Sequence, residues 1–518
     1  MSLDGSPFAD HLGTNYVPSD AEVAEIRSLL AGPEENLARL NAEIEALERA
    51  LIELREKREA LKQPIDAHRA LISPIRLLPF DILAEIFLAC LPSKREALID
   101  ESKAPLLLGR ICRHWRAVAY STPALWSSIH IPWESECPPA ILAKLETVVD
   151  AWLRRSAACS LSVSLAVPYH AVDVAFDSKG HKLILQVLSV SGRLCHLGLN
   201  GGSELLRPFL QLGQQDLPRL RSIAINCLND QFSSGDASYM EPLQVSTLQH
   251  ISLIARDVNP LTLPINWSQL TRLRLECEGR RGIFGGVEGG LVLDDALNVL
   301  RRASNLVFCH LRFYHTPTAV GPQTFSSSAP IILPHIRTLT LTDVILEKWI
   351  SHLVAPNLRY LQIGSTSADA EDTGLSVGVD VYSLAGNAFQ ELLQCLPSIS
   401  RLRVFGNHYG PQRLDKAYIA SFYAPYNLCP SLTHLKIHTA DLSDGDVLEL
   451  AKARIAMPTP LKRLEIHLSR RMEVDLLPEL EAFIPHGLRV ELIYQQTQWE
   501  FHPPHGLQHH IWEPMYYS

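Results

Sequence analysis

The sequence has few of the features that mark membrane, secreted or metal-binding proteins. No run of apolar residues approaches the ~18 needed to span a bilayer, and the N-terminal residues MSLDGSPFADHL have neither the basic nor the apolar region of a signal peptide. No two of the ten cysteines are closer than 22 residues, whereas metal sites and disulfide-rich domains need closely spaced cysteines. We therefore expect reduced thiols and a location in the cytoplasm, the nucleus or both.

Signals for nucleic-acid binding and catalysis are also missing. The 56 acidic residues outnumber the 47 lysines and arginines, giving a net charge of −9, which argues against a general nucleic-acid binder. The chain has no Gly-x-Ser-x-Gly and no His-Glu-x-x-His motif, and its glycine-rich segment 279–290 lacks the ending of a phosphate loop. The C-terminal histidines alternate with prolines and have no nearby cysteine, which favours a surface tail: His502, His505, His509 and His510. We expect no catalytic group, no cofactor and no metal.

A long charged helix is predicted for residues 21–72. Its apolar residues are spaced alternately three and four apart, which is the seam pattern of a coiled coil: Leu37, Leu40, Ile44, Leu47, Leu51, Leu54, Leu61 and Ile65. Arg58 occupies the one seam position that breaks the series. We expect Pro33 to delimit the helix, and Pro64 and Pro74 to interrupt it, because proline lacks the N–H group of a helix interior.

The charged residues beside this seam indicate how the helix can pair. A parallel, in-register pair of copies would place Glu43 against Glu48 of the second copy, which is repulsive. The same pair would place Lys57 against Lys62, which is repulsive too. An antiparallel pair would instead bring Glu43 near Lys57. We expect a parallel self-dimer to be disfavoured, and the helix to pair in one of three ways: antiparallel, with another protein, or against its own chain. An isolated helix that spaces the segment 74–131 from the N-terminal tail is the alternative.

The segment 74–131 contains a helix that is apolar almost all the way round. Pro79 is suited to the first turn of a helix, where its missing N–H is not needed. The residues that follow are apolar on both sides of the helix: Ile82, Leu83, Ile86, Phe87, Leu88 and Leu91. Because a surface helix needs only one apolar stripe, this helix either lies deep in a core or has a face for a partner protein. A Cys-Arg-His-Trp-Arg block (112–116) and a Thr-Pro-Ala-Leu-Trp block (122–126) come next.

These blocks, in this order, resemble the F-box, the helical module by which substrate receptors dock on the Skp-type adaptor of a cullin–RING ubiquitin ligase. The whole chain resembles the F-box receptors that are abundant in mushroom-forming fungi. The insertion 92–103 departs from the F-box pattern. The resemblance implies that one set of residues contacts the adaptor, with the tryptophan fixing the second helix: Leu78, Pro79, Ile82, Leu83, Ile86, Phe87 and Trp115.

Beyond Trp133 the chain becomes repetitive. A pattern of three aliphatic residues, with two residues and then one between them, recurs ten times, beginning at residues 194, 220, 248, 270, 306, 336, 358, 399, 432 and 461. Helices are predicted between several blocks, at 294–303, 346–354, 389–396 and 447–454. Such strand-and-helix units resemble a divergent leucine-rich-repeat solenoid. The helix 141–153 and the strand 161–167 are predicted to form the first unit, and the segment 364–380 to be a loop.

The solvent-facing positions of these strands are predicted to be basic. The residues before the second and third aliphatic positions face outward, and among them Glu465 is the only acid. The basic residues are Arg272, Arg274, Arg401, Arg403, Lys436 and Arg463. This composition favours an acidic or phosphorylated target protein held by arginine side chains. The alternative is that arginine merely fills exposed strand positions.

The fold predicted is an α/β solenoid, leucine-rich-repeat-like, preceded by an all-α F-box and a long charged coiled-coil helix. Its predicted parts are a disordered tail (1–20), the coiled-coil helix (21–72), the F-box (74–131) and the repeat domain (132–518). The function this implies is the substrate-recognition subunit of a ubiquitin ligase, which binds the adaptor, through it the cullin and RING subunits, and an unknown protein substrate. A non-catalytic scaffold without a ubiquitylation role, and an enzyme whose site lies in the loops, are the alternatives.

Overall fold

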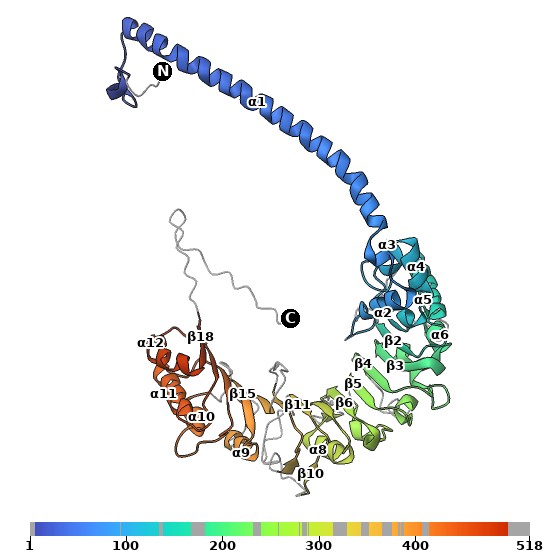
Figure 1. The fold of residues 1–518 in the computed structure, drawn as a ribbon. Coiled ribbons are helices and arrows are strands. Elements are labelled where there is room, and N and C mark those ends of the chain that lie inside the picture. The colour runs from blue at the N-terminus through green and yellow to red at the C-terminus, as the bar shows by residue number, and fades with distance from the viewer. Residues whose placement is uncertain are drawn as a thin grey trace. The chain divides into compact units, whose positions relative to one another are not determined.

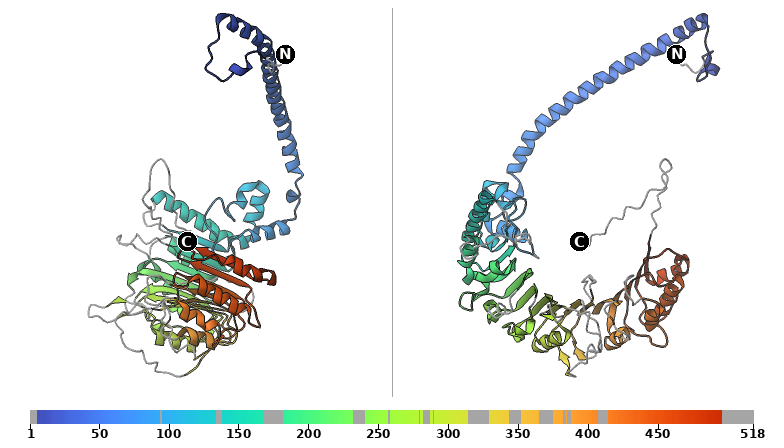
Figure 2. Two further views of the ribbon diagram at one scale, coloured as in Figure 1. Left: turned by 90° about the vertical axis from the view of Figure 1, so that its left-hand side faces the viewer. Right: turned by 180° about the vertical axis from the view of Figure 1, so that it is seen from behind.

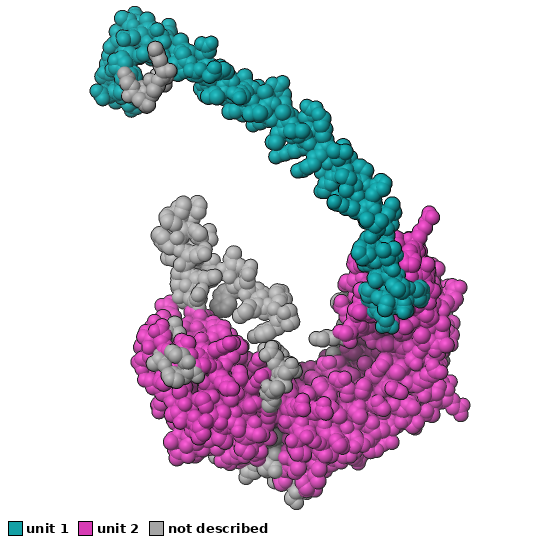
Figure 3. Space-filling model, in the orientation of Figure 1, with its two compact units in different colours: residues 1–86 teal, residues 87–518 magenta. Residues whose placement is uncertain are grey.

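A computed structural model describes most of the chain (Figures 1 and 2). The described residues are 6–93, 95–133, 138–166, 182–231, 240–256, 258–278, 280–281, 287–288, 290–313, 329–342, 352–364, 375–381, 384, 388–406 and 414–495. The chain divides into two compact units, Met1–Ile86 and Phe87–Ser518, which Figure 3 distinguishes by colour. The C-terminal histidines and most of the glycine-rich segment 279–290 lie outside the described residues.

The first unit is dominated by one 52-residue helix, α1 (Asp20–Leu71). It begins at a capping box, in which Ser19 and Glu22 satisfy each other's backbone N–H groups. Before it, the 3-10 helix η2 (Ala9–His11) and a hydrogen bond from the Tyr16 hydroxyl to Glu22, 2.9 Å long, give residues expected to be disordered a defined local structure. Two further elements follow α1: η3 (Pro74–Arg76) and α2 (Phe80–Ala89), whose last residues belong to the second unit.

The prediction that prolines delimit and interrupt this helix is wrong for Pro33 and Pro64, whereas Pro74 lies beyond the end of α1, at the start of η3. Both Pro33 and Pro64 lie inside α1, and Figure 1 shows a helix that bends without breaking. Each proline removes one backbone hydrogen bond, while the alanine, leucine, glutamate and arginine residues around them favour helix strongly. A long helix accommodates the loss by curving.

The second unit is built on a single parallel sheet of 14 strands, which lie side by side in the order of the chain. The strands are β1 (Ser128–Pro132), β2 (Leu161–Ala166), β3 (Leu194–Asn200), β4 (Ser222–Gln231), β5 (His250–Arg256), β6 (Arg272–Glu278), β9 (Phe308–Arg312), β11 (Thr338–Thr342), β13 (Tyr360–Ile363), β14 (Leu375–Asp380), β15 (Ile399–Phe405), β16 (His434–Thr439), β17 (Arg463–Leu468) and β18 (Arg489–Tyr494). Two small sheets pair β10 (Ile331–Ile332) with β12 (Leu353–Val354) and β7 (Arg280–Arg281) with β8 (Val287–Glu288).

Helices cover the outer side of this curved sheet, as α8, α9 and α11 show in Figure 1. The α-helices of the second unit that follow α2 are α3 (Leu108–Ile111), α4 (Arg113–Tyr120), α5 (Pro139–Arg155), α6 (Lys182–Leu188), α7 (Ser203–Leu210), α8 (Leu293–Arg302), α9 (Ala388–Cys395), α10 (Lys416–Ile419), α11 (Asp444–Ile455) and α12 (Leu477–Leu480), with the 3-10 turn η4 (Pro123–Trp126) after α4. Alternate strand residues, such as Leu435 and Ile437 in β16, point into the core between sheet and helices. This order is that of an α/β solenoid, in which each unit packs on its neighbours.

The ten predicted strands all belong to this sheet, so the periodicity located them correctly. The predicted helices at 141–153, 294–303, 389–396 and 447–454 are confirmed as α5, α8, α9 and α11. The prediction of a helix at 346–354 falls largely outside the described residues, and its last two residues form β12 instead.

Three strands of the 14-stranded sheet were missed. The loop predicted at 364–380 is wrong for residues 375–380, which form β14 because Leu375, Val377 and Val379 alternate into the core. Its small residues Ser376 and Gly378 are poor strand formers, which hid the pattern. The strand β1 lies inside the segment assigned to the F-box, and β18 follows the last predicted block. Both lie at the ends of the sheet, where the repeat pattern is weakest.

Candidate functional site

The helix α2 has one buried and one exposed apolar face. Leu83 and Phe87 are fully buried (0% exposed), and Ala84 beside them is 9% exposed. Ile82 and Ile86 are 46% and 39% exposed. Because residues four apart lie above one another on a helix, each pair marks one face. The isoleucine face is therefore apolar and open to solvent, which is the property expected of a helix that binds a partner.

Further exposed apolar side chains lie just before this face. Phe80, Leu77 and Ile75 are 51%, 74% and 41% exposed. We call Ile75, Leu77, Phe80, Ile82 and Ile86 together the α2 surface. Several large apolar side chains exposed in one short segment are more informative than a single one, because such groups are typical of binding sites. Leu77 and Phe80 flank Leu78 and Pro79 in the sequence but were not among the predicted adaptor-binding residues.

The structure corrects the predicted set of adaptor-binding residues. Five of the seven are exposed or half-buried: Pro79, Ile82, Ile86, Leu78 and Trp115. The prediction is wrong for Leu83 and Phe87, whose side chains have no exposed surface and so offer nothing to a partner. The ring of Trp115 lies 4.9 Å from that of Phe87, so this tryptophan supports the buried face.

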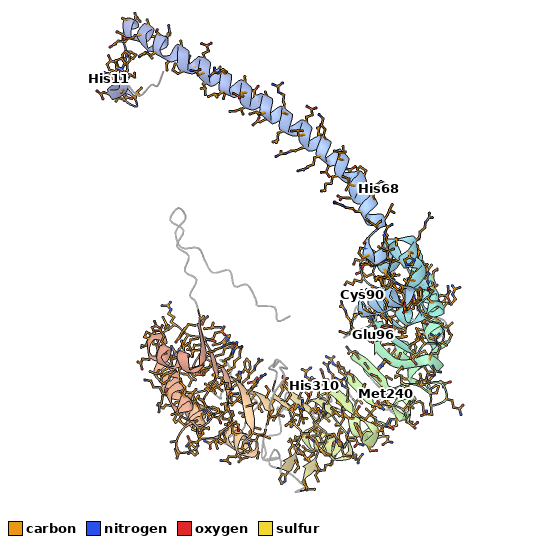
Figure 4. The ribbon with its side chains drawn as sticks, in the orientation of Figure 1. His11, His68, Cys90, Glu96, Met240 and His310 are labelled. Carbon is orange, nitrogen blue, oxygen red and sulfur yellow. The ribbon has the colours of Figure 1, made fainter. Side chains whose placement is uncertain are left out.

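The insertion 92–103, which departs from the F-box pattern, covers one edge of the sheet. The N–H of His130 in β1 donates to the carbonyl of Ala97 at 2.8 Å. The hydroxyls of Ser162 and Ser164 in β2 donate to Glu96, labelled in Figure 4, at 3.2 and 3.3 Å. An uncovered edge strand would expose unpaired backbone groups. The insertion thus ends the sheet.

Aromatic residues join the following helices to the first strand-and-helix unit. The buried indole of Trp126 donates to the carbonyl of Ala119 at 2.8 Å, and its ring lies 5.0 Å from that of Trp152 on α5. The guanidinium of Arg155 lies 4.1 Å from the ring centre of Tyr120 and 4.7 Å from that of Trp126. These contacts fix α4 and η4 against α5.

The predicted basic residues lie on the side of the sheet that the helices leave open to solvent, but they form two separate groups. The strand register places one continuous row across the sheet: Arg274, His310, Thr340, Gln362, Gly378, Arg403, Lys436, Glu465 and Glu491. His310 is labelled in Figure 4. The four strands β9, β11, β13 and β14 separate Arg274 from Arg403, a distance of roughly 24 Å along the sheet. The middle of the row carries neutral side chains.

Acidic residues also accompany several of these cations. The Arg274 Nε donates to the Glu276 carboxylate at 2.6 Å, and Glu276 lies one position beyond the two columns considered in the sequence analysis. Lys436 pairs with Glu465, and Arg463 lies 3.3 Å from Glu465 and 3.5 Å from Glu491. The predicted basic strip is therefore two clusters with mixed charge, which we call the β6 cluster (Arg272, Arg274, Glu276) and the β15–β17 cluster (Arg401, Arg403, Lys436, Arg463, Glu465).

The β15–β17 cluster continues into a stack of rings. The ring of His438 lies 4.7 Å from that of Phe405 and 3.9 Å from that of His467. Burial lowers the pKa of His438 to about 4, so this imidazole is neutral at physiological pH. Partial burial of Glu465 is outweighed by hydrogen bonds from Lys436 and His467, which lower the pKa of Glu465 to about 2. The arrangement is a firmly held polar and aromatic surface, suited to binding.

Comparison with known proteins gives no family assignment. No family model matches the chain, and no curated protein matches it significantly. Within the described ranges, no helix combines the length and the apolarity needed to cross a membrane. Over those same residues, no group of three or more histidine, cysteine or acidic side chains is arranged to hold a metal ion.

Proposed function

We propose that this chain is the substrate-recognition subunit of a cullin–RING ubiquitin ligase. The α2 surface docks on a Skp-type adaptor, as the resemblance to the F-box implies. The side of the sheet that the helices leave open, with divergent leucine-rich repeats, binds the target protein. One observation carries the proposal: α2 buries Leu83 and Phe87 but leaves Ile82 and Ile86 exposed. A helix with an open apolar face fits a partner's groove through anchors one turn apart.

The two charged clusters on the sheet support an acidic target. Arginine presents a planar set of donors that binds carboxylates and phosphates in pairs. Since the β6 and β15–β17 clusters lie roughly 24 Å apart, they suit a target with acidic or phosphorylated groups at two places. Neutral side chains between them, such as Thr340 and Gln362, leave room for an uncharged stretch.

Proximity is the mechanism by which such a receptor acts. The receptor holds the target near the ubiquitin-conjugating enzyme, which raises the effective concentration of the target's lysines at the activated thioester. The chain's role is binding and positioning, and the chemistry belongs to the other subunits.

Adaptor binding is tested with the double variant Ile82→Asp/Ile86→Asp in the full chain. Each isoleucine contributes on the order of 1–2 kcal/mol when a partner covers it, so we expect affinity for a purified Skp-type adaptor to fall at least about 100-fold. Phe87 is left unchanged because it is buried, and its replacement would damage the fold. The matched control is Ile141→Asp, an isoleucine of α5 that is 54% exposed, which should bind as the unmodified chain does.

The affinity for the adaptor is measured by calorimetry or by binding to the immobilised adaptor. Thermal unfolding of each variant shows whether the fold is kept. Equal affinity of the double variant, or no adaptor binding by the unmodified chain, contradicts the proposal. Recovery of the cullin together with the adaptor from cells distinguishes a ligase receptor from a scaffold, which would bring down at most the adaptor.

A further inference from the structure

The helix α1 presents an apolar seam along its length whose side chains are exposed. No residue of the helix is buried. The seam residues are between 47% and 65% exposed: Leu37, Leu40, Ile44, Leu47, Leu51, Leu54, Leu61 and Ile65. A helix of this length gains stability mainly by packing an apolar face, so a seam of this kind indicates a partner helix.

We propose that α1 pairs with α1 of a second copy of this chain, in antiparallel orientation. The paired seam extends from Leu37 to Leu61, and the charged residues that flank it extend from Glu34 to Lys62. The whole stretch lies between Pro33 and Pro64, the two prolines of the helix. The proposal is independent of the proposed ligase function, because it uses neither the α2 surface nor the sheet.

One register satisfies both the seam and the prolines. In an antiparallel pair, Leu37 packs against Leu61 of the second copy, Ile44 against Leu54, and Leu47 against Leu51. Arg58 faces Leu40 and can extend its charged end to solvent while its methylene groups cover the leucine. Sliding one helix by a heptad in either direction would bring Pro33 or Pro64 into the paired stretch, where the local helix geometry is distorted.

Charge complementarity favours this arrangement over a parallel one. In the antiparallel register Glu43 flanks Lys57 of the second copy, and Glu34 flanks Lys62, so that the symmetric dimer has four attractive contacts. One like pair, Glu48 with its own copy, opposes them at the centre. A parallel dimer has only repulsive contacts among these residues, two between Glu43 and Glu48 and two between Lys57 and Lys62.

Zero-length crosslinking of the full-length protein tests the orientation directly. Glu43 and Lys57 are 14 residues apart, which is about 21 Å along one helix. A carbodiimide joins only carboxylates and amines in contact, so a Glu43–Lys57 crosslink must connect two molecules. We expect this crosslink and a Glu34–Lys62 crosslink in a species of twice the chain mass. A monomer over the whole concentration range, measured by light scattering, overturns the proposal.

Charge reversal gives a second test that separates the two orientations. The variant Glu43→Lys places two positive charges side by side in the antiparallel dimer, the new one and that of Lys57, and we expect its dissociation constant to rise roughly tenfold. The double variant Glu43→Lys/Lys57→Glu restores the attraction and should return to the original value. In a parallel dimer the single variant would instead bind more tightly, because it would face Glu48. Tighter association of the single variant therefore overturns the antiparallel arrangement.

Discussion

The helix α1 and the 14-stranded sheet are both rich in leucine, yet they treat it in opposite ways. In α1, Leu47 is 65% exposed, whereas in the sheet Leu464 is completely buried. The sheet supplies its own neighbours, since each strand-and-helix unit packs on the next one. In the helix, by contrast, no residue is buried. The same residue type therefore stabilises the fold in one region and is left for association in the other.

The largest expected effect comes from shortening a leucine in each region. Leu464→Ala in β17 removes a fully buried side chain and should lower the free energy of unfolding of the sheet by about 2–5 kcal/mol. Leu47→Ala in α1 should leave that transition unchanged. Urea unfolding followed by tryptophan fluorescence measures both, at concentrations where the chain is monomeric. Equal shifts for the two variants would contradict the comparison.

A buried arginine provides the next test. Arg454 of α11 is fully buried, and its guanidinium donates to the carbonyls of Leu428, Cys429 and Leu432 at 3.2, 2.8 and 3.4 Å. Arg454→Met leaves these buried acceptors without a donor, which should cost roughly 3 kcal/mol. The matched control on α1 is Arg49→Met.

Arg49 is exposed and donates only to a carbonyl of its own helix, so its replacement should not shift the thermal unfolding midpoint measurably. An Arg454→Met protein as stable as the unmodified chain would show that the carbonyls find other donors or water.

The third predicted loss of stability is the smallest, and it depends on pH. The carboxylate of Asp444 is 1% exposed and accepts hydrogen bonds from Arg470 at 2.6 Å and from the N–H groups of Glu473 and Val474 at 2.7 and 2.8 Å. Burial opposes ionisation, but these bonds and one from Tyr494 outweigh it, so the pKa of Asp444 is lowered. Asp444→Asn should therefore destabilise the chain by about 2 kcal/mol at pH 7.

The sign of the pH dependence follows from linkage. Because the pKa of Asp444 is lower in the folded than in the unfolded protein, its ionised carboxylate stabilises the folded state at pH values above the unfolded-state pKa of about 3.9. This stabilisation is lost as the pH falls through the folded-state pKa. The gap in unfolding midpoint between the unmodified chain and Asp444→Asn should thus narrow below about pH 4. The control is Asp66→Asn on α1, where the carboxylate is 51% exposed and 3.7 Å from Arg69; at pH 7 it should leave the unfolding midpoint unchanged. A gap at Asp444 that does not change with pH would contradict the pKa assignment.

The spacing of apolar residues predicted helices and strands well where that spacing was regular. Blocks of three aliphatic residues located ten strands, because alternation into a core is a property of a few consecutive residues. The same signal failed for β14, whose small residues Ser376 and Gly378 obscured it. Helix propensity was underestimated at Pro33, because one missing hydrogen bond is a small loss within a 52-residue helix.

The candidate sites were predicted less completely. The sequence placed Arg274 and Lys436 on the solvent-facing side of the sheet but not beside Glu276 and Glu465. The contact between Lys436 and Glu465 depends on the strand register, which brings residues 29 apart to neighbouring positions. Arg274 and Glu276 instead lie two residues apart in the same strand, β6. A third outward column, to which Phe405, His438 and His467 belong, would have been found by extending each block by one residue.

The sequence alone determined that α2 is apolar on two faces and that the repeats form strands, because both are periodicities of neighbouring residues. Only the tertiary structure decided that Leu83 and Phe87 are buried and that Ile82 and Ile86 remain exposed. Which face of a helix is covered depends on packing against residues distant in the chain, and no local pattern contains that information.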